Sequence, residues 1–320
     1  MKKGKQQMTH VVKDNALINA SYNLELVEQR IVLQAIVKAR ETETGFDTKT
    51  PVFIHASEYE KQYNVTKDGA YKALKDAVLS LFERQFSYRE INERGNTENV
   101  RSRWVSEVRY VDAEATVKLI FSPAVASMCS RLERHFTSYD LDQIAGLSSK
   151  YAVRLYELVI AWKATGKTPV FKLQDFRDKI GLLDENEYST MSNFKKFVLD
   201  LAVDQINEHT DIKLTYEQHK TGRTITGFSF KFKQKVKQQK IEQQQQQRDQ
   251  NTPGLFNKMT DAQRHLFAHK LAHDARVQSD YSRLIGTGSY DDFAKLLADM
   301  LAEEKHFKMF FPLLVEYGFK

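Results

Sequence analysis

The chain has 320 residues, which is room for roughly two or three domains of ordinary size. Hydrophobic residues make up 41% of it, enough for real cores, and the single cysteine, Cys129, excludes an internal disulfide. We expect Cys129 to be a buried small hydrophobe. The sequence has no apolar run of about 18 residues to span a membrane and no signal peptide at its start. We therefore expect a cytoplasmic protein without a membrane partner.

The net charge of +6 conceals a local asymmetry, because basic residues gather in three places. Lys2, Lys3 and Lys5 lie in residues 1–14, which we interpret as a basic N-terminal tail. The other two places are the segments 220–223 and 231–240, and no carboxylate lies between Lys220 and Lys240. Such patches favour an anionic partner, most commonly nucleic acid, and a solvated surface is the competing interpretation for each patch alone.

Residues 15–138 are predicted to form a first domain. An amphipathic helix over 23–40 precedes the segment Thr50-Pro51-Val52-Phe53, and Ser57 is an N-cap candidate after it. Thr66 can cap a helix over 67–82, whose apolar residues recur at spacings of three and four. We then expect a hairpin with strands 85–91 and 100–111 around a polar turn at 93–99, and a further strand at 116–121.

Residues 139–235 repeat this order. The segment Thr168-Pro169-Val170-Phe171 matches the earlier one, a helix over 149–164 precedes it, and Asp175-Phe176 marks another helix start. A helix over 190–208 should bury one apolar face, with these residues: Phe194, Phe197, Val198, Leu201, Ala202 and Ile206. A hairpin follows, with strands 212–218 and 224–232 and a turn at 220–223.

The second hairpin has a clear inside and outside. Phe228, Phe230 and Phe232 share one face, and Lys231 and Lys233 share the other. Ile225 is out of phase with them, and Gly227 is a plausible bulge that resets the register. Helix, short strand, helix, turn, helix and hairpin is the order of a winged helix, and here it occurs twice.

The remainder of the chain has a different character. Residues 236–258 are rich in glutamine and have almost nothing to bury, so we interpret them as a linker. Residues 259–320 predict helices over 260–278 and 289–304, a less defined stretch at 279–285, and an apolar end at 308–319. The fold class is therefore α+β: two tandem winged-helix domains, a Gln-rich linker and a small α-helical C-terminal module of unknown role.

A winged helix reads DNA with its third helix in the major groove while its wing lies along the phosphates. In the second domain we expect these residues to contact DNA: Tyr188, Ser189, Thr190, Ser192, Asn193, Lys195, Lys196, Lys220 and Arg223. In the first domain, where nearby carboxylates dilute the charge, we expect phosphate contacts or a protein interface at these residues: Lys67, Tyr71, Lys72, Lys75, Arg94, Arg101 and Arg103. The last three belong to its expected wing. A solvated surface is the alternative interpretation for each of them.

Catalytic and metal sites have little support. Gly166-Lys167-Thr168 resembles the end of a phosphate-binding loop, but the position of the first glycine, with four residues between it and Gly166, is occupied by Ala161, and Pro169 follows. His265, His269 and His273 share one helical face without a Cys or Glu beside them, which favours a polar surface over a metal site. No two histidines are two residues apart, so the metal pair of a DNA-nicking replication enzyme is missing. We expect no enzyme activity, cofactor or metal.

Over residues 14–233 the chain resembles an iteron-binding plasmid replication initiator of the tandem winged-helix Rep family. The resemblance rests on these stretches taken together: VVKDNALINASYNLELVEQRIVLQAI, RQFSY, RWVSEVRY, YDLDQIAGLSSKYAVRLYELVIAWKATGKTP and INEHTDIKLTYEQHKTGRTITGFSFKFK. It implies a non-enzymatic initiator that binds tandem origin repeats as a monomer, helps to melt adjacent DNA and brings in the host initiator and replicative helicase. It also implies a dimer, formed through the first domain, that represses its own gene and limits copy number.

The resemblance places base reading on residues 188–196 and the wing at Lys220 and Arg223, and phosphate contacts on the first domain. Three other functions remain open from the sequence. They are a transcriptional repressor with two winged helices and no role in initiation, a DNA-nicking replication enzyme, and a protein-interaction scaffold.

Overall fold

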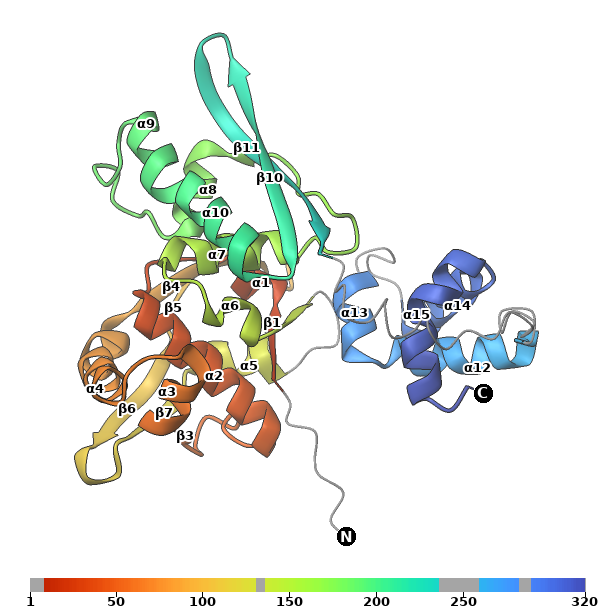
Figure 1. The fold of residues 1–320 in the computed structure, drawn as a ribbon, viewed down its shortest axis with the longest axis horizontal. Coiled ribbons are helices and arrows are strands. Elements are labelled where there is room, and N and C mark those ends of the chain that lie inside the picture. Colours follow the sequence, from red (N-terminus) through yellow and green to blue (C-terminus); the bar gives the residue numbers. More distant parts are fainter. Residues whose placement is uncertain (1–8, 131–135, 236–258, 282–288, 320) are drawn as a thin grey trace. The chain divides into compact units, whose positions relative to one another are not determined.

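The structure is a computed structural model that describes residues 9–130, 136–235, 259–281 and 289–319 (Figure 1). It divides into two compact parts, Met1–Gln234 and Lys235–Lys320, which are described separately. The larger part holds both predicted winged-helix units, which we call the first unit (15–138) and the second unit (139–235). The lysines near the N-terminus and the Gln-rich linker, 236–258, lie outside the described residues.

The first unit follows the predicted order with additions before its first long helix. Its elements are β1 (His10–Asp14), α1 (Asn15–Ile18), β2 (Ser21–Tyr22), α2 (Leu26–Thr42), β3 (Val52–His55), α3 (Ala56–Tyr63), α4 (Lys67–Glu83), β4 (Gln85–Ile91), β5 (Thr97–Arg103), β6 (Val105–Val111), the 3-10 turn η1 (Asp112–Glu114), β7 (Thr116–Phe121), α5 (Pro123–Ser130) and β8 (Phe136–Asp140). Residues 10–14, which we had placed in the tail, form a strand that pairs antiparallel with β8.

Helix α4 forms as its sequence predicts. The Thr66 side chain accepts a hydrogen bond from the Gly69 backbone N–H and caps the helix. The predicted apolar residues are all buried: Ala70, Leu74, Ala77, Val78 and Leu81. In α5, Cys129 is fully buried, and burial raises the pKa of its thiol to about 12, so the prediction of an inert small hydrophobe is confirmed.

The predicted strand 100–111 is wrong, because it is two strands in different sheets. Strand β5 belongs to the sheet β2-β4-β5, and β6 belongs to the sheet β3-β7-β6. The break falls at Trp104, which has no exposed surface and packs its ring against Tyr22 and Phe86 at centroid distances of 4.8 and 4.9 Å. Burying this large ring turns the chain away from β4 and starts the next strand.

This break changes which hairpin is the wing of the first unit. In the second unit the short strand after the first helix pairs with the last strand, in the order β10-β11-β9. The sheet β3-β7-β6 has the same order, so the wing of the first unit is β6–β7 with its tip at Asp112–Glu114. The hairpin β4–β5, which carries Arg94, Arg101 and Arg103, is an insertion and not the wing, contrary to our expectation.

The second unit repeats the plan. Its elements are α6 (Asp142–Ala145), α7 (Lys150–Ile160), β9 (Phe171–Lys172), α8 (Leu173–Ile180), α9 (Met191–Phe194), the π-helical turn η2 (Lys195–Asp200), α10 (Leu201–His209), β10 (Ile212–Thr221) and β11 (Thr224–Gln234). The segment 166–168 is a turn between α7 and β9, as predicted, and the Thr168 hydroxyl accepts a hydrogen bond from the Phe230 backbone N–H.

The second hairpin has a bulge, as predicted, one residue before Gly227. His219 pairs with Gly227 and Lys220 pairs with Ile225, so Thr226 is the extra residue. A Cβ at Gly227 would collide with the carbonyl oxygen of Phe171, which explains the glycine there.

The predicted apolar face of the third helix in the second unit is partly wrong. Phe197 and Leu201 are 45% and 42% exposed, whereas the other four predicted residues are buried. The cause is the π-helical turn, whose wider hydrogen-bonding pattern adds a residue and shifts the phase of the helix. The buried stripe therefore recurs every four residues, at Phe194, Val198, Ala202 and Ile206, and the two remaining side chains face outward.

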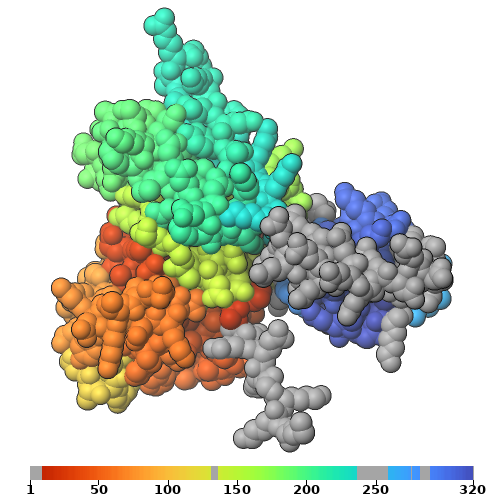
Figure 2. All heavy atoms as spheres, viewed as in Figure 1, coloured from red at the N-terminus to blue at the C-terminus, as the bar shows by residue number. Residues whose placement is uncertain are grey.

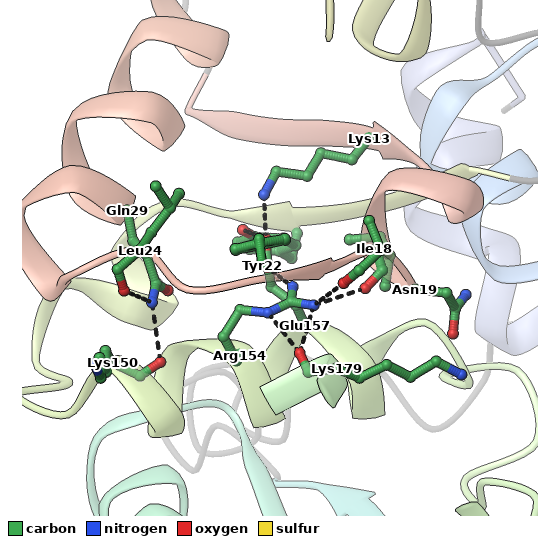
Figure 3. A network of polar contacts seen from close by, with 12 residues as sticks. Lys13, Ile18, Asn19, Tyr22, Leu24, Gln29, Lys150, Arg154, Glu157 and Lys179 are labelled. Carbon is green, nitrogen blue, oxygen red and sulfur yellow. Dashed lines mark hydrogen bonds and ion pairs between the residues drawn. The ribbon is translucent and has the colours of Figure 1, made fainter. Parts of the chain in front are cut away.

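A buried ionic network joins the N-terminal strands to α7 (Figure 3). The Glu157 carboxylate accepts hydrogen bonds from the Lys13 ammonium at 2.7 Å, the Tyr139 hydroxyl at 2.7 Å, the Arg154 guanidinium at 2.8 Å and the Tyr22 hydroxyl at 3.2 Å. Arg154 also donates to the backbone carbonyls of Ile18, Ala20 and Lys179. Glu157 and Arg154 of the second unit thus bind side chains and backbone carbonyls within residues 13–22 of the first unit.

The C-terminal part has its own hydrophobic core, built on Phe267, Leu271, Phe293, Leu297 and Phe310. Its elements are α12 (Asp261–Ala272), α13 (Ala275–Tyr281), α14 (Tyr290–Leu301) and α15 (Glu304–Glu316). The predicted helix 260–278 is instead two helices, because the Asp274 carboxylate accepts the Arg276 backbone N–H and the Gln278 side chain donates to the last carbonyl of α12. The uncertain stretch 279–285 lies outside the described residues beyond Tyr281.

Candidate nucleic-acid interface

The third helix of the second unit presents a short polar face at its N-terminal end. The Thr190 hydroxyl caps it by accepting the Asn193 backbone N–H at 3.4 Å. Five of the predicted residues are exposed around this end: Ser189, Thr190, Ser192, Asn193 and Lys196. Hydroxyl, amide and ammonium groups of this kind can pair with base edges or with phosphates. A ligand can therefore approach these side chains, although the Thr190 hydroxyl is already engaged in the cap.

The two other predicted residues of this helix are half-buried. Tyr188 has a positive φ of 48°. Its carbonyl accepts the Arg177 guanidinium at 3.1 Å, and its ring packs near Tyr151 and Phe197. The Lys195 ammonium lies 6.0 Å from the ring centroid of Tyr216. Tyr188 thus packs the loop against α7 and the helix, and Lys195 contacts the wing through Tyr216.

The wing of the second unit is a long hairpin that projects beyond the rest of the unit (Figure 2). Thr221 pairs with Thr224, so Gly222 and Arg223 form a two-residue turn, and Gly222 has the positive φ of 61° that such a turn requires. Lys220 and Arg223 are exposed at this tip. They carry the cationic end of the hairpin away from the core.

The base of this wing is fixed to the third helix. Phe228 and Phe230 are fully buried beneath it, and the Tyr216 hydroxyl donates to the Asp200 carboxylate at 2.6 Å. Burial, together with this acceptor, raises the pKa of Tyr216, so the phenol stays a donor. Helix and wing are thereby held in one arrangement, and both project toward the same end of the unit in Figure 1.

The first unit has a different electrostatic arrangement. Lys67 and Lys72 are exposed on α4, but Tyr71 and Lys75 are engaged by Asp112 at the tip of the wing. The Asp112 carboxylate accepts the Lys75 ammonium at 2.8 Å and the Tyr71 hydroxyl at 3.1 Å. These hydrogen bonds lower the pKa of Asp112, which therefore stays anionic. Asp112 was not among the predicted site residues, although the acidic turn Asp112–Glu114 between two alternating strands was an available signal.

The three predicted arginines of the first unit are spread over the inserted hairpin. Arg94 lies in its turn and Arg101 is exposed on β5. Arg103 is instead held against the end of α4, where its guanidinium donates to the Phe82 carbonyl at 2.6 Å and to the Glu83 carboxylate at 3.1 Å. The structure thus does not gather these arginines into one site.

The histidine row of the C-terminal part does not form a metal site. Within the described residues, no three His, Cys, Asp or Glu side chains lie close enough to share a metal ion, and no helix has the length and hydropathy of a membrane span. His269 and His273 lie ring to ring at 4.7 Å, and His273 stacks on Tyr290 at 4.9 Å. His269 and His273 thus form part of a packed aromatic surface with Tyr290.

Comparison with known proteins gives matches for both units. A family model described as "Initiator Replication protein, WH1" matches residues 10–160, and one described as "Initiator Rep protein, WH2" matches residues 172–232. An uncharacterized 27.6 kDa protein of Escherichia coli is 24% identical over 221 residues, which cover 67% of this chain and 91% of that protein.

Two solved structures are also similar. The Pi initiator protein in complex with iteron DNA has a TM-score of 0.54 and 20% identity, and covers 72% of this chain and 100% of its own. At that identity the likeness shows the fold alone. The WH1 domain of a replication protein isolated from a multiple sclerosis patient is 57% identical, with a TM-score of 0.33, and covers 38% of this chain and 93% of its own.

Proposed function

This chain belongs to the family of initiator replication proteins, and from that premise we propose that it starts replication of a plasmid by binding tandem repeats at the origin. The observation that carries the proposal is the exposed face at 189–196 beside a stiff wing tipped by Lys220 and Arg223. A helix of this kind fits the major groove while cations at the wing tip meet phosphates. The Pi initiator, which shares the fold, was solved with iteron DNA.

In this proposal the second unit selects the site and the first unit adds phosphate contacts through Lys67, Lys72 and Arg101. The bound chain promotes opening of the origin and recruits the host initiator and replicative helicase in the cytoplasm. As a dimer formed through the first unit, it represses its own gene and so limits copy number. No cofactor or catalytic step is needed, because opening follows from binding energy.

The proposal is tested by replication in trans. A plasmid that carries the direct repeats flanking this gene, but no initiator gene, should replicate only in cells that supply the chain. Specific binding to the repeats without any replication would instead identify a transcriptional repressor. A covalent protein–DNA product on supercoiled origin plasmid would identify a nicking enzyme. Failure to bind the repeats even at low salt would contradict the DNA-binding proposal altogether.

Base reading and phosphate contact should separate in two variants. Asn193→Ala should reduce the discrimination between repeat DNA and random DNA by about 1–3 kcal/mol, because a side-chain amide pairs with a base edge. Arg223→Ala should weaken binding to both DNAs by the same factor, because a phosphate contact carries no sequence information. Titrations on both DNAs at one salt concentration measure this. Equal losses on both DNAs for both variants would refute the division of roles.

The acidic wing tip of the first unit should oppose DNA binding. In Asp112→Asn a negative charge is lost beside Lys75, and that ammonium becomes available to a phosphate. We expect affinity for any DNA to rise a few-fold, and the slope of log K against log salt to steepen by about one. Glu41→Gln, which removes an exposed negative charge elsewhere in the first unit, is the control. A weaker or unchanged affinity in Asp112→Asn would show that the first unit does not approach phosphates there.

A further inference from the structure

One large apolar side chain lies on the proposed reading face of the second unit. Phe197 is 45% exposed and follows Asn193 by four residues, so both lie on the same side of the helix. Its ring centroid is 6.2 Å from that of Tyr188, and the Lys196 ammonium is 5.1 Å from its centroid. These neighbours hold the ring in place while much of its surface remains open to solvent.

The outward position of Phe197 has a specific structural cause. The π-helical turn Lys195–Asp200 shifts the helix phase, so that the buried stripe passes through Val198 and Leu199 instead. The exposed ring forgoes the hydrophobic stabilisation that its burial would give. Turns of this kind occur frequently at functional sites, and here the turn moves an aromatic ring onto a polar, cationic face.

The chemistry of the major groove limits what such a ring could contact. Among base edges in that groove, the C5-methyl group of thymine is the apolar one, and a Phe side chain can pack against it. Four residues of helix advance by about 6 Å, and base pairs are spaced by about 3.4 Å. Phe197 should therefore lie about two base pairs beyond the position that Asn193 contacts.

The same helix shows where this contact should end. Leu201 is 42% exposed one turn further along, but Asp200 precedes it and Asp204 lies on the next turn. These carboxylates repel phosphates, whereas Lys196 beside Phe197 attracts them. A DNA ligand is therefore expected over Phe197 and not over Leu201, which makes Leu201 a matched control.

We propose that Phe197 reads a thymine in the bound DNA through its C5-methyl group, a specificity-determining contact that rests on the proposed function. The probe is a repeat in which each thymidine is replaced in turn by deoxyuridine, which lacks only that methyl group. For the wild-type chain, replacing thymidine at one or two positions should lower the affinity about fourfold, because one methyl group is no longer buried in the complex. The other positions should change little.

In Phe197→Ala the difference between thymine and uracil at those positions should disappear, so the ratio of the two affinities becomes about one. Phe197→Leu, which keeps an apolar side chain, should retain part of the ratio, and Leu201→Ala should retain all of it. Thermal unfolding of each variant checks that the fold is kept. The inference would be overturned if the wild-type chain bound the repeat with the same affinity whichever thymine was replaced by uracil. It would also be overturned if Phe197→Ala kept the wild-type ratio of the two affinities. A wild-type chain that prefers no repeat DNA would instead overturn the proposed function.

Discussion

Replacing Glu157 with alanine should lower the free energy of unfolding by about 3–5 kcal/mol. The reason is that Lys13 and Arg154 are only 2% and 1% exposed, and both would remain buried after losing their carboxylate partner. The hydroxyls of Tyr22 and Tyr139 would lose an acceptor as well. Urea denaturation of the full chain measures the effect as a lower midpoint with an unchanged slope.

The same network predicts an acid-sensitive fold. Burial alone would raise the pKa of Glu157, but the charges of Lys13 and Arg154 outweigh it and lower the pKa from 4.5 to about 2. Because the folded-state pKa is depressed, the stabilisation is complete above about pH 4.5 and is lost as the pH falls towards 2. A Glu157→Gln variant should therefore show a flatter loss of stability over that interval than the wild-type chain.

Glu217 provides the control, since it also pairs with a lysine. Its carboxylate accepts the Lys231 ammonium at 2.6 Å, but the two side chains are 54% and 61% exposed. Exposed ion pairs of this kind contribute little to the free energy of unfolding, so Glu217→Gln should leave the urea midpoint unchanged. If Glu157→Ala lowered the free energy of unfolding no more than Glu217→Gln does, the buried network would not be what holds the N-terminal strands to α7.

The elements that the sequence predicts well are those with local signals. Thr66 and the apolar spacing after it define α4, and the recurrence of Thr-Pro-Val-Phe marks the short strand of both units. The hairpin of the second unit and its bulge could be predicted. The alternating phenylalanines indicate which face is buried, and the glycine indicates where the register shifts. The exposure of Ser189, Thr190, Ser192, Asn193 and Lys196 agrees with their polarity.

The features that escaped prediction depend on distant partners. Trp104 continues an alternating pattern, and only its packing against Tyr22 and Phe86 shows that the chain changes sheets there. Phe197 fits a helical apolar stripe, and the π-helical turn that exposes it has no simple sequence signature. The engagement of Lys75 by Asp112 joins residues 37 positions apart. Nonlocal pairing of this kind, and with it the position of the first wing, requires the folded structure.

Removing three cations of the second unit together should reduce affinity for repeat DNA by about a hundredfold at 0.15 M salt. The variant is Lys196→Ala, Lys220→Ala and Arg223→Ala, which strips the helix end and the wing tip. Each neutralised phosphate contributes about −0.9 to the slope of log K against log salt, so a wild-type slope near −5 should fall to about −2. A salt series from about 0.05 to 0.2 M, fitted for both proteins, gives the two slopes.

The matched control removes the same charge elsewhere, in Lys49→Ala, Lys61→Ala and Lys305→Ala, three exposed lysines outside the proposed interface. Both triple variants lose three positive charges, so a general electrostatic attraction would weaken equally in the two. If phosphates bind at the helix end and the wing tip, the interface variant should lose most of its salt dependence of log K, and the control variant should keep the wild-type slope. Equal slopes in the two variants would mean that the wing tip and helix end are not where phosphates are neutralised, whatever the affinity of the wild-type chain.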